Sequence, residues 1–366
     1  MKAAVVNAVG EDFVIEDVEI ADPIGGEVLV DVKASGLCHS DAHIQKIDFG
    51  FPMPVVLGHE IAGVVKAVGP DVVDLKVGDR VAASLVGACG VCDSCIAGKR
   101  HICENTDSLL RGPDEPSRLT RKDGSAVTQF QGISGFAEQC LVHENQLVKV
   151  PETVPFDKAC LLGCGVVTGA GAVLKTAGVR VNDDVAVIGC GGVGLNAVQA
   201  ARLAGARRII AIDLQPAKLE LAKKFGATHV INPNEVEDVV AAVHEITGRK
   251  GVDHAFEVIG LKPTAEQAFQ LVGPDGTAYL IGMQRPGTRL DIDPITQMIM
   301  TPRTLHGVYM GSTNAKLDIP MFADYYEQGR FNLDDLVSRT ITLDEINEGY
   351  AELDKGGVAR SVIVFD

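Results

Sequence analysis

The sequence is poor in positive charge for its length. Its 366 residues have a formal net charge of −16, and no cluster of Lys and Arg offsets that charge locally. An acidic surface repels polyanions, so we expect no nucleic-acid partner. Internal repeats and low-complexity tracts are also missing, so a repeat architecture is not expected.

Long hydrophobic runs are missing too. Charged residues interrupt each apolar run before it reaches about eighteen residues, the length typical of a membrane-spanning helix. The opening stretch MKAAVVNAVGEDF has neither a long apolar core nor a small-residue cleavage site, the features of a secretory signal. We therefore expect a soluble cytoplasmic protein without a membrane partner. In that compartment the nine cysteines are expected to be metal ligands and free thiols rather than disulfides.

The order of β-rich and mixed segments predicts two domains, which also suits the length. Short β-rich runs separated by Gly and Pro occupy roughly the first 150 residues, and helical spacing follows over residues 151–175. Beyond residue 185, strands and helices alternate, which indicates an α/β fold with a parallel, doubly wound sheet. The strands we expect are 27–34, 61–68, 80–84, 185–188, 208–212, 229–231, 253–257, 277–281 and, closing the chain, 359–365.

A glycine-rich turn after the strand at residues 185–188 predicts a dinucleotide site. Its sequence is GCGGVG, with Gly189, Gly191, Gly192, Val193 and Gly194 as the candidate binding residues. Side chains there would collide with a pyrophosphate, while the free N–H groups at the helix start attract its charge. Asp213 ends the next strand, where a carboxylate accepts hydrogen bonds from the adenosine ribose and repels a 2′-phosphate. The pattern therefore favours NAD over NADP.

Four cysteines follow one another in a short glycine-containing loop. Cys89, Cys92, Cys95 and Cys103 form a C-x2-C-x2-C-x7-C array. Four thiolates can close a tetrahedron around zinc and leave no open position, so we expect a structural site. An iron–sulfur cluster is the alternative for such a ligand set.

A second set of candidate ligands is dispersed along the chain. It comprises Cys38 in GLCHSDAH, His59 and Glu60 in LGHE, and Cys164 in LLGCG. Spacing alone does not unite them, because single Cys and His residues are commonly packing or surface residues. One imidazole and two thiolates on the same zinc would leave a fourth position for water or a substrate oxygen, the arrangement of a catalytic site.

These motifs, in this order, resemble the zinc-containing medium-chain alcohol dehydrogenases over nearly the whole chain. The resemblance implies that residues 1–164 and 310–366 form a GroES-like catalytic domain, with a Rossmann NAD-binding domain at residues 165–309 inserted between them. It also implies two zinc ions per subunit, one catalytic and one structural, together with NAD.

The resemblance assigns further roles to single residues. Cys38, His59 and Cys164 match the catalytic zinc ligands, and Glu60 matches an acid that approaches the metal. Ser40 and His43 match the relay that carries the alcohol proton through the cofactor ribose to water. Outside the zinc context, Ser40 would cap a helix beginning near Asp41, and His43 would be an exposed helical residue.

Other matched positions concern the cofactor and the substrate. His39 takes the place of an arginine against the pyrophosphate, so cofactor affinity is expected to depend more on pH. Lys218 matches a ribose contact and Arg360 a pyrophosphate contact. Leu85 and Phe130 match walls of the substrate pocket, which suits a medium-chain or aromatic primary alcohol or its aldehyde.

The predicted reaction is reversible hydride transfer between such an alcohol and NAD. The thiol-adduct formaldehyde dehydrogenases of the same family have an arginine where this chain has Asp107, which disfavours an anionic glutathione adduct and leaves other thiol carriers open. A nicotinoprotein with permanently bound NAD is a close alternative, and a zinc- or redox-sensing binding protein without turnover is an alternative of another class. Relatives pair strands corresponding to residues 277–283 and 290–292 across a two-fold axis, so a homodimer or homotetramer is expected.

Overall fold

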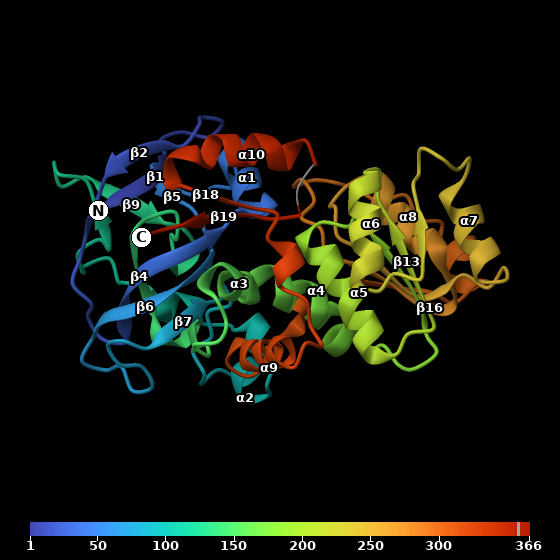
Figure 1. Ribbon diagram of the computed structural model, residues 1–366, viewed down its shortest axis with the longest axis horizontal. Helices are drawn as coiled ribbons and strands as arrows, with labels where there is room; N and C mark the ends of the chain where they lie inside the picture. The colour runs from blue at the N-terminus through green and yellow to red at the C-terminus, as the bar shows by residue number, and fades with distance from the viewer. Residues whose placement is uncertain (357–358) are drawn as a thin grey trace. The chain divides into compact units, whose positions relative to one another are not determined.

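The computed structural model describes residues 1–356 and 359–366. The chain forms two compact units. Unit 1 comprises residues 1–165 and 314–366, and unit 2 comprises residues 166–313. Figure 1 shows that unit 1 is rich in strands and that unit 2 alternates strands with helices, so the expected α/β fold class is confirmed.

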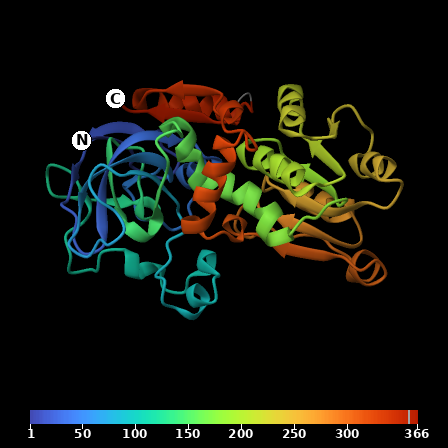
Figure 2. The same cartoon turned by 60° about the horizontal axis from the view of Figure 1, so that its bottom comes forward.

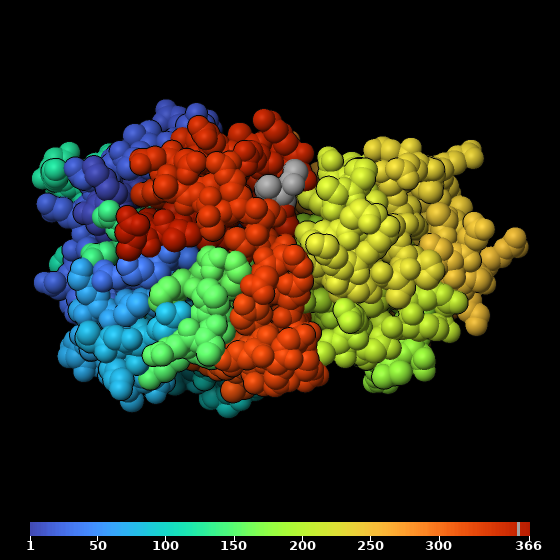
Figure 3. Space-filling model, in the orientation of Figure 1, coloured from blue at the N-terminus to red at the C-terminus, as the bar shows by residue number. Residues whose placement is uncertain are grey.

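The larger sheet of unit 1 brings the two ends of the sequence together. Its strand order is β11-β7-β6-β4-β19-β18, and β10 pairs with β4 off this path. The C-terminal strand β19 is antiparallel to β4, with Val362 opposite Gly36. Figure 3 shows the C-terminal residues (red) on the surface of unit 1 beside N-terminal segments (blue). The bounds are β4 Glu27–Gly36, β6 Glu60–Val68, β7 Arg80–Ala83, β10 Gln139–His143, β11 Leu147–Lys149, β18 Arg339–Ile341 and β19 Ser361–Val364.

A second sheet of unit 1 has the order β2-β1-β5-β9-β8-β3. Small and β-branched side chains such as Ala3, Val5 and Val56 lie buried on it, which suits close packing of pleated strands. The bounds are β1 Lys2–Val6, β2 Val14–Asp17, β3 Glu19–Ile20, β5 Val55–Val56, β8 Leu119–Thr120 and β9 Ala126–Gln129.

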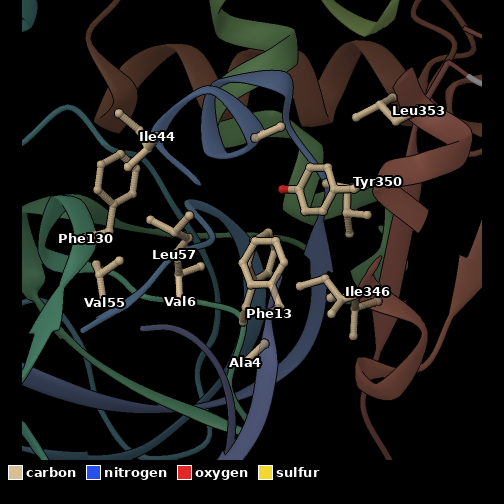
Figure 4. Packing of buried hydrophobic residues seen from close by; sticks show 14 of the residues in the cluster. Ala4, Val6, Phe13, Ile44, Val55, Leu57, Phe130, Ile346, Tyr350 and Leu353 are labelled. Carbon is tan, nitrogen blue, oxygen red and sulfur yellow. The ribbon is translucent and has the colours of Figure 1, made fainter. Parts of the chain in front are cut away.

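Helices of unit 1 cover the apolar core that supports the region around residue 38. In that core Phe13 stacks on Tyr350 at a ring separation of 5.4 Å, and Leu57 and Phe136 are fully buried beside them. Figure 4 shows Tyr350 and Ile346 facing Phe13 from α10. Helices α1 and α10 contribute side chains to this core. The helices of unit 1 are α1 His39–Lys46, α2 Asp93–Ile96, α3 Phe156–Leu161, α9 Ala315–Glu327 and α10 Ile346–Asp354.

A continuous helical stretch covers Phe156–Ala177, and it includes π-helical turns at Leu162–Val166 and Ala172–Ala177. By length and composition this is the one helix among the described residues that could cross a membrane, with a window of mean hydropathy 1.5. The sequence expectation did not identify this helix, because it considered only apolar runs without charged residues. Of that window 83% is buried inside the protein, as in a core helix.

Unit 2 contains a parallel sheet with the strand order β14-β13-β12-β15-β16-β17. This is the doubly wound order, in which successive strands are added first on one side of β12 and then, from β15 onward, on its other side. Helices α5 and α6 lie on the sheet in Figure 1, while α7 and α8 pack with Ala186, Ile210 and Ala255 in one apolar core. The bounds are β12 Asp184–Ile188, α5 Gly192–Ala204, β13 Arg208–Ile212, α6 Pro216–Phe225, β14 His229–Ile231, α7 Val239–Ile246, β15 Val252–Glu257, α8 Lys262–Leu271, β16 Val272–Leu280 and β17 Thr304–Gly307, with α4 at Val167–Gly171.

One sequence-based expectation for unit 2 is wrong. Residues 290–292 do not form a strand, and the Asp291 N–H donates instead to Glu266 of α8 at 2.6 Å. The edge position belongs to β17, whose Thr304 pairs with Thr277 of β16. Because β17 is short and largely exposed, its sequence lacks the apolar alternation by which a strand is recognised.

Candidate functional site

Four dispersed residues of unit 1 meet in a buried cluster. Cys38 lies between β4 and α1, His59 precedes β6, Glu60 opens β6, and Cys164 lies in the π-helical turn Leu162–Val166. One ligand atom from each lies within 4.8 Å of the others, and all four residues are buried. The fold therefore brings together four residues whose spacing in the sequence did not show that they share one site.

Glycines beside the cluster allow its elements to approach closely. A Cβ on Gly163 would lie 1.7 Å from the Ala83 carbonyl oxygen, so only glycine lets the helix pack against the end of β7. A Cβ on Gly36 would lie 2.4 Å from Glu60 Oε2. These contacts explain the glycines of the GLC and LGC segments by packing, and a π-helical turn is a common device at functional sites.

Asp41 orients His59, a role that sequence inspection missed. Its Oδ1 lies 3.0 Å from His59 Nδ1 and accepts the Gly58 N–H at 3.1 Å. Burial raises the pKa of the Asp41 carboxyl, and the charge of His59 opposes that rise. A proton on Nδ1 leaves Nε2, which lies 3.2 Å from Cys164 Sγ, as a lone-pair donor toward the cluster. The sequence signal for this role is the Asp of GLCHSD, to which the sequence pattern assigns only the start of a helix.

The two thiols of the cluster are electrostatically unlike. A hydrogen bond between them lowers the pKa of Cys38 well below its usual value and raises that of Cys164 well above it. Burial opposes ionisation of Cys38, while the positive Arg360, whose Nη2 is 3.8 Å from Cys38 Sγ, favours it. Cys38 is therefore predisposed to be the thiolate, the form in which cysteine ligates metals.

Glu60 has one oxygen paired and one without a partner. Its Oε1 lies 3.2 Å from Arg360 Nη2, whereas Oε2 is buried and has no hydrogen-bond partner among the described residues. Burial raises the pKa of Glu60 to about 7, against the attraction of Arg360. Two sulfurs, an imidazole nitrogen and a nearby carboxylate fit the donor preferences of zinc, and the unpaired Oε2 is the kind of atom that a cation would satisfy.

Ser40 and His43 both lie on α1, one turn apart. The Ser40 hydroxyl is 3.1 Å from Cys38 Sγ and 3.4 Å from His59 Nε2, so it lies beside the ligand cluster. The helix-cap interpretation of Ser40 is wrong: α1 begins at His39, Cys38 is its N-cap residue, and no side chain caps it. Residues three apart share a helix face, so His43 follows Ser40 on the same side.

Aromatic rings adjoin the imidazole of the cluster. Phe130 makes an edge contact with His59 at 6.2 Å between ring centroids, and Phe51 makes one with Phe130 at 5.2 Å. Phe130 is buried, while Phe51 and Leu85 are half-buried. Phe51 was not anticipated, because the loop that contains it has no periodic pattern.

The four-cysteine loop forms its own compact cluster in unit 1. Its Sγ atoms lie within 4.8 Å of one another, and Cys92 Sγ is 3.9 Å from Cys103 Sγ, close to the ~3.8 Å edge of a tetrahedron with Zn–S bonds of about 2.3 Å. The N–H groups of Cys89 and Asn105 donate to Cys103 Sγ, which stabilises a thiolate. Figure 2 shows this segment (teal) at the periphery of unit 1.

In unit 2 the glycine turn has the geometry that a pyrophosphate needs. Gly189 has a φ of +99°, which favours glycine, and a Cβ on Gly194 would lie 1.8 Å from the Gly189 carbonyl oxygen. A Cβ on Gly191 would meet no atom within 4 Å, so this position is open for close approach of a ligand to the backbone. These are the tight-turn, packing and approach roles of the three glycines in dinucleotide-binding turns.

Asp213 also holds the glycine turn. Its Oδ2 accepts the Cys190 N–H at 2.8 Å and its Oδ1 accepts the Gln215 N–H at 2.9 Å. Lys218 lies half-buried in the first turn of α6, the helix that follows Asp213 in the chain. The remaining cofactor candidates belong to unit 1: His39 is exposed at the start of α1, and Arg360 is buried against Glu60.

Two family models match the chain. Residues 25–152 match the alcohol dehydrogenase GroES-like domain, and residues 192–324 match the zinc-binding dehydrogenase domain. The alcohol dehydrogenase class-3 of Cereibacter sphaeroides is 36% identical over 379 residues, covering 100% of this chain and 99% of that protein. The NDMA-dependent alcohol dehydrogenase of Amycolatopsis methanolica is 37% identical over 369 residues, covering 99% and 98%. The crystal structure of benzyl alcohol dehydrogenase from Acinetobacter calcoaceticus superimposes with a TM-score of 0.91 at 36% identity, covering 100% and 99%.

A GroES-like unit with a cysteine–histidine cluster and a Rossmann-type unit with a dinucleotide turn define a zinc- and nicotinamide-dependent oxidoreductase. The chain belongs to the zinc-containing medium-chain alcohol dehydrogenase family. It is an alcohol dehydrogenase whose cofactors are zinc and NAD(P).

Proposed function

We propose that this protein interconverts primary alcohols and their aldehydes with NAD, using a zinc ion held by Cys38, His59 and Cys164. The observation that carries the proposal is the buried convergence of these three side chains, with the Ser40 hydroxyl beside them. Three protein ligands leave one position for the substrate, as in catalytic rather than structural zinc sites.

Each ligand is prepared by its own surroundings. Asp41 fixes the ring of His59, Arg360 favours the Cys38 thiolate, and Glu60 supplies a carboxylate with one free oxygen. Bound zinc would make the alcohol oxygen more acidic, and bound NAD would accept the hydride. Ser40 then holds the proton that leaves the alcohol, and His43, one turn along α1, takes it toward solvent.

The second zinc is proposed to be structural, with Cys89, Cys92, Cys95 and Cys103 as its ligands. Burial raises the pKa of Cys95 to about 12, whereas hydrogen bonds from the backbone lower that of Cys92 to about 6. A positive ion in their midst would bring all four to the thiolate form. The loop has few buried apolar residues, so metal binding contributes to its folding.

Unit 2 is proposed to bind NAD rather than NADP. Gly189, Gly191 and Gly194 form the turn, with Gly192 and Val193 at the start of α5, and Asp213 is the carboxylate for the adenosine ribose. A negative charge at this point repels a 2′-phosphate. His39, Lys218 and Arg360 remain proposed cofactor contacts.

For the substrate we propose a medium-chain or aromatic alcohol. Phe51 and Phe130 form an aromatic pair that reaches the imidazole of His59, and rings of this kind favour an aromatic or extended apolar group. Leu85 is proposed to line the substrate pocket together with these two rings. Asp107 is exposed, and its charge argues against an anionic glutathione adduct. A relative of similar identity, from Paracoccus denitrificans, is nevertheless named S-(hydroxymethyl)glutathione dehydrogenase.

A nicotinoprotein is the second candidate, favoured by the relative named as an NDMA-dependent alcohol dehydrogenase. Such a protein would retain its nicotinamide cofactor through dialysis and would pass electrons to another acceptor. A zinc- or redox-sensing protein without turnover is disfavoured, because Ser40 adjoins an intact set of ligands.

The test is to incubate the zinc-loaded protein with NAD and a panel of primary alcohols while following the absorbance of reduced nicotinamide. Growth of that band with a benzylic or medium-chain alcohol supports the proposal. If no free reduced nicotinamide accumulates, but an added artificial electron acceptor is reduced as the alcohol is oxidised, the nicotinoprotein is supported. If neither happens, the proposed function fails.

We also propose a cytoplasmic homodimer or homotetramer. In unit 2 the short strand β17 is an edge strand of the parallel sheet, and Ile295, Ile299 and Met300 are 61%, 71% and 74% exposed nearby in sequence. Pairing of such edges across a two-fold axis buries both features. A monomeric mass at micromolar concentration by light scattering would refute the association.

A further inference from the structure

A fully buried carboxylate of unit 2 lies at the carboxyl end of β15 and has no role so far. Glu257 is 0% exposed. Its Oε1 accepts three hydrogen bonds, from the Ile259 N–H at 2.9 Å, the Gly260 N–H at 2.8 Å and the Thr264 hydroxyl at 2.9 Å. One side-chain oxygen thus fixes the loop after β15 and the start of α8.

The backbone of Glu257 fixes a second loop. Its carbonyl oxygen accepts the N–H groups of Ile281 and Gly282, at 2.9 and 3.1 Å, just beyond β16. The two loops are packed backbone to backbone, because a Cβ on Gly282 would lie 2.0 Å from the Gly260 nitrogen. Glu257 therefore joins the carboxyl ends of two neighbouring strands.

The loop held by Glu257 lies directly against the glycine turn. A Cβ on Gly189 would lie 2.7 Å from Ile259 Cγ1, and one on Gly194 would lie 3.2 Å from Val258 Cγ2. The Val258 N–H also donates to the Ile188 carbonyl oxygen at 3.1 Å. The turn can keep its shape only if residues 258–260 keep theirs.

The strand order gives this position its functional meaning. Strands β12 and β15 are neighbours that run parallel, with Ile188 opposite Glu257, and the chain reverses its winding between them. Ligands of open α/β sheets bind outside the carboxyl ends of strands at such a switch point. Glu257 lies immediately beneath that edge.

Burying a carboxylate is energetically unfavourable, so its presence in the core calls for a role beyond holding a loop. Burial raises the pKa of Glu257, and hydrogen bonds from Gly260, Thr264 and Ile259 oppose the rise. Its Oε2 has no hydrogen-bond partner within residues 1–356 and 359–366, so half of its bonding capacity is unused. A buried carboxylate that accepts several N–H bonds holds them more strongly than a neutral acceptor does.

We propose that Glu257 is a positioning residue for the dinucleotide: it holds residues 258–260 against Gly189 and Gly194 and so presets the turn that receives NAD. The inference deepens the proposed function, because it rests on NAD binding at this turn. Without Glu257 the loop must be ordered when the cofactor binds, and that ordering weakens affinity.

The test is calorimetric titration of NAD into wild type and variants, each first checked for folding by circular dichroism. Glu257→Ala should weaken NAD binding roughly tenfold or more, because three bonds to one charged acceptor are lost. Glu257→Gln keeps an acceptor oxygen of the same reach and should restore affinity to within about threefold. Should Glu257→Ala fail to fold, Thr264→Val removes one of the three bonds and should weaken binding about twofold to threefold.

Asp184→Asn is the matched control. Asp184 is also a buried carboxylate of the sheet, 3% exposed, but it opens β12 and pairs with Arg207 and Arg208 at the opposite end of the strand. Its loss should lower the melting temperature and leave NAD affinity within twofold of wild type. Wild type that fails to bind NAD would overturn the proposed function. If wild type binds NAD but Glu257→Ala has the same affinity for NAD, the role of Glu257 alone is overturned. The same holds if Asp184→Asn binds NAD as weakly as Glu257→Ala does.

Discussion

Asp41 Oδ1 and His59 Nδ1 lie 3.0 Å apart, and neither side chain is more than 1% exposed. Asp41 is in α1 and His59 precedes β6, so the pair joins two segments that each end next to the ligand cluster. A carboxylate behind a metal-binding imidazole fixes its tautomer and raises its basicity. This role explains why the acidic residue Asp41 is buried although it does not contact the proposed substrate.

Replacing Asp41 by Asn should weaken zinc binding at the cluster roughly 10- to 100-fold. The amide oxygen can still accept from Gly58 and His59, but the negative charge behind the imidazole is gone. Competition with a graded series of chelators measures the effect. Asp48→Asn, at an exposed carboxylate just beyond the same helix, should leave zinc affinity unchanged, and equal affinities in wild type and Asp41→Asn would remove this role.

Asp213→Gly should change the choice of cofactor. NAD should bind more weakly and NADP should lose its repulsion, a relative shift on the order of 1 to 3 kcal/mol for one charged hydrogen-bonding group. Because Asp213 also accepts the Cys190 N–H, some loss of affinity for both cofactors is expected as well. The ratio of dissociation constants for NAD and NADP is the measurement, and an unchanged ratio counts against the ribose contact.

His43→Gln should slow turnover most at low pH, where water is a poor base, by about 10²-fold or less. Ser40→Ala should slow turnover more at every pH, since the Ser40 hydroxyl lies beside both Cys38 and His59. Rates against pH for wild type and both variants make the comparison. Superimposable profiles would leave the zinc ligands standing and reject the relay.

Acid should weaken a buried ion-pair group in unit 1. Glu27, 5% exposed, pairs with Arg111 and Arg118 at 2.6 and 2.7 Å. Burial opposes its ionisation, but the arginines hold the pKa of Glu27 below its usual 4.5. Because the folded-state pKa is the lower one, the stabilisation is present above pH ~4.5 and is lost as the pH falls through the folded value.

Glu27→Gln should therefore lower the free energy of unfolding by roughly 3 kcal/mol at pH 7, since it leaves two guanidinium groups buried without their partner. The difference from wild type should shrink below pH 4, and urea denaturation at several pH values measures it. Glu16→Gln, in the more exposed pair with Arg121, should cost about 1 kcal/mol or less. A pH-independent difference for Glu27→Gln would contradict the assignment.

The sequence predicts best what depends on local periodicity. Strands at 208–212 and 229–231 are found where apolar β-branched runs place them, and the glycines of the turn follow from steric need. The short edge strand β17 could not be predicted, because an exposed edge has no buried face to impose alternation.

Contacts across the fold were harder to predict. Asp41 and Glu257 are ordinary acids in the sequence, and only the pairing of β6 with β4, or of β15 with β12, gives them buried partners. In the π-helical turn that contains Cys164, Gly163 lies so close to the Ala83 carbonyl oxygen that no Cβ fits, and the local sequence does not reveal this contact.

We propose that Cys38, His59 and Cys164 hold the zinc at which alcohol is oxidised. Zinc content per subunit, measured on purified wild type and Cys164→Ser together with NAD-dependent alcohol oxidation, tests it most directly. We predict two zinc ions and turnover for wild type, and for Cys164→Ser one zinc ion, no turnover and largely unchanged cooperative unfolding, because the four-cysteine site is intact. A Cys164→Ser protein with two zinc ions and the wild-type rate would show that Cys164 does not hold a catalytic zinc.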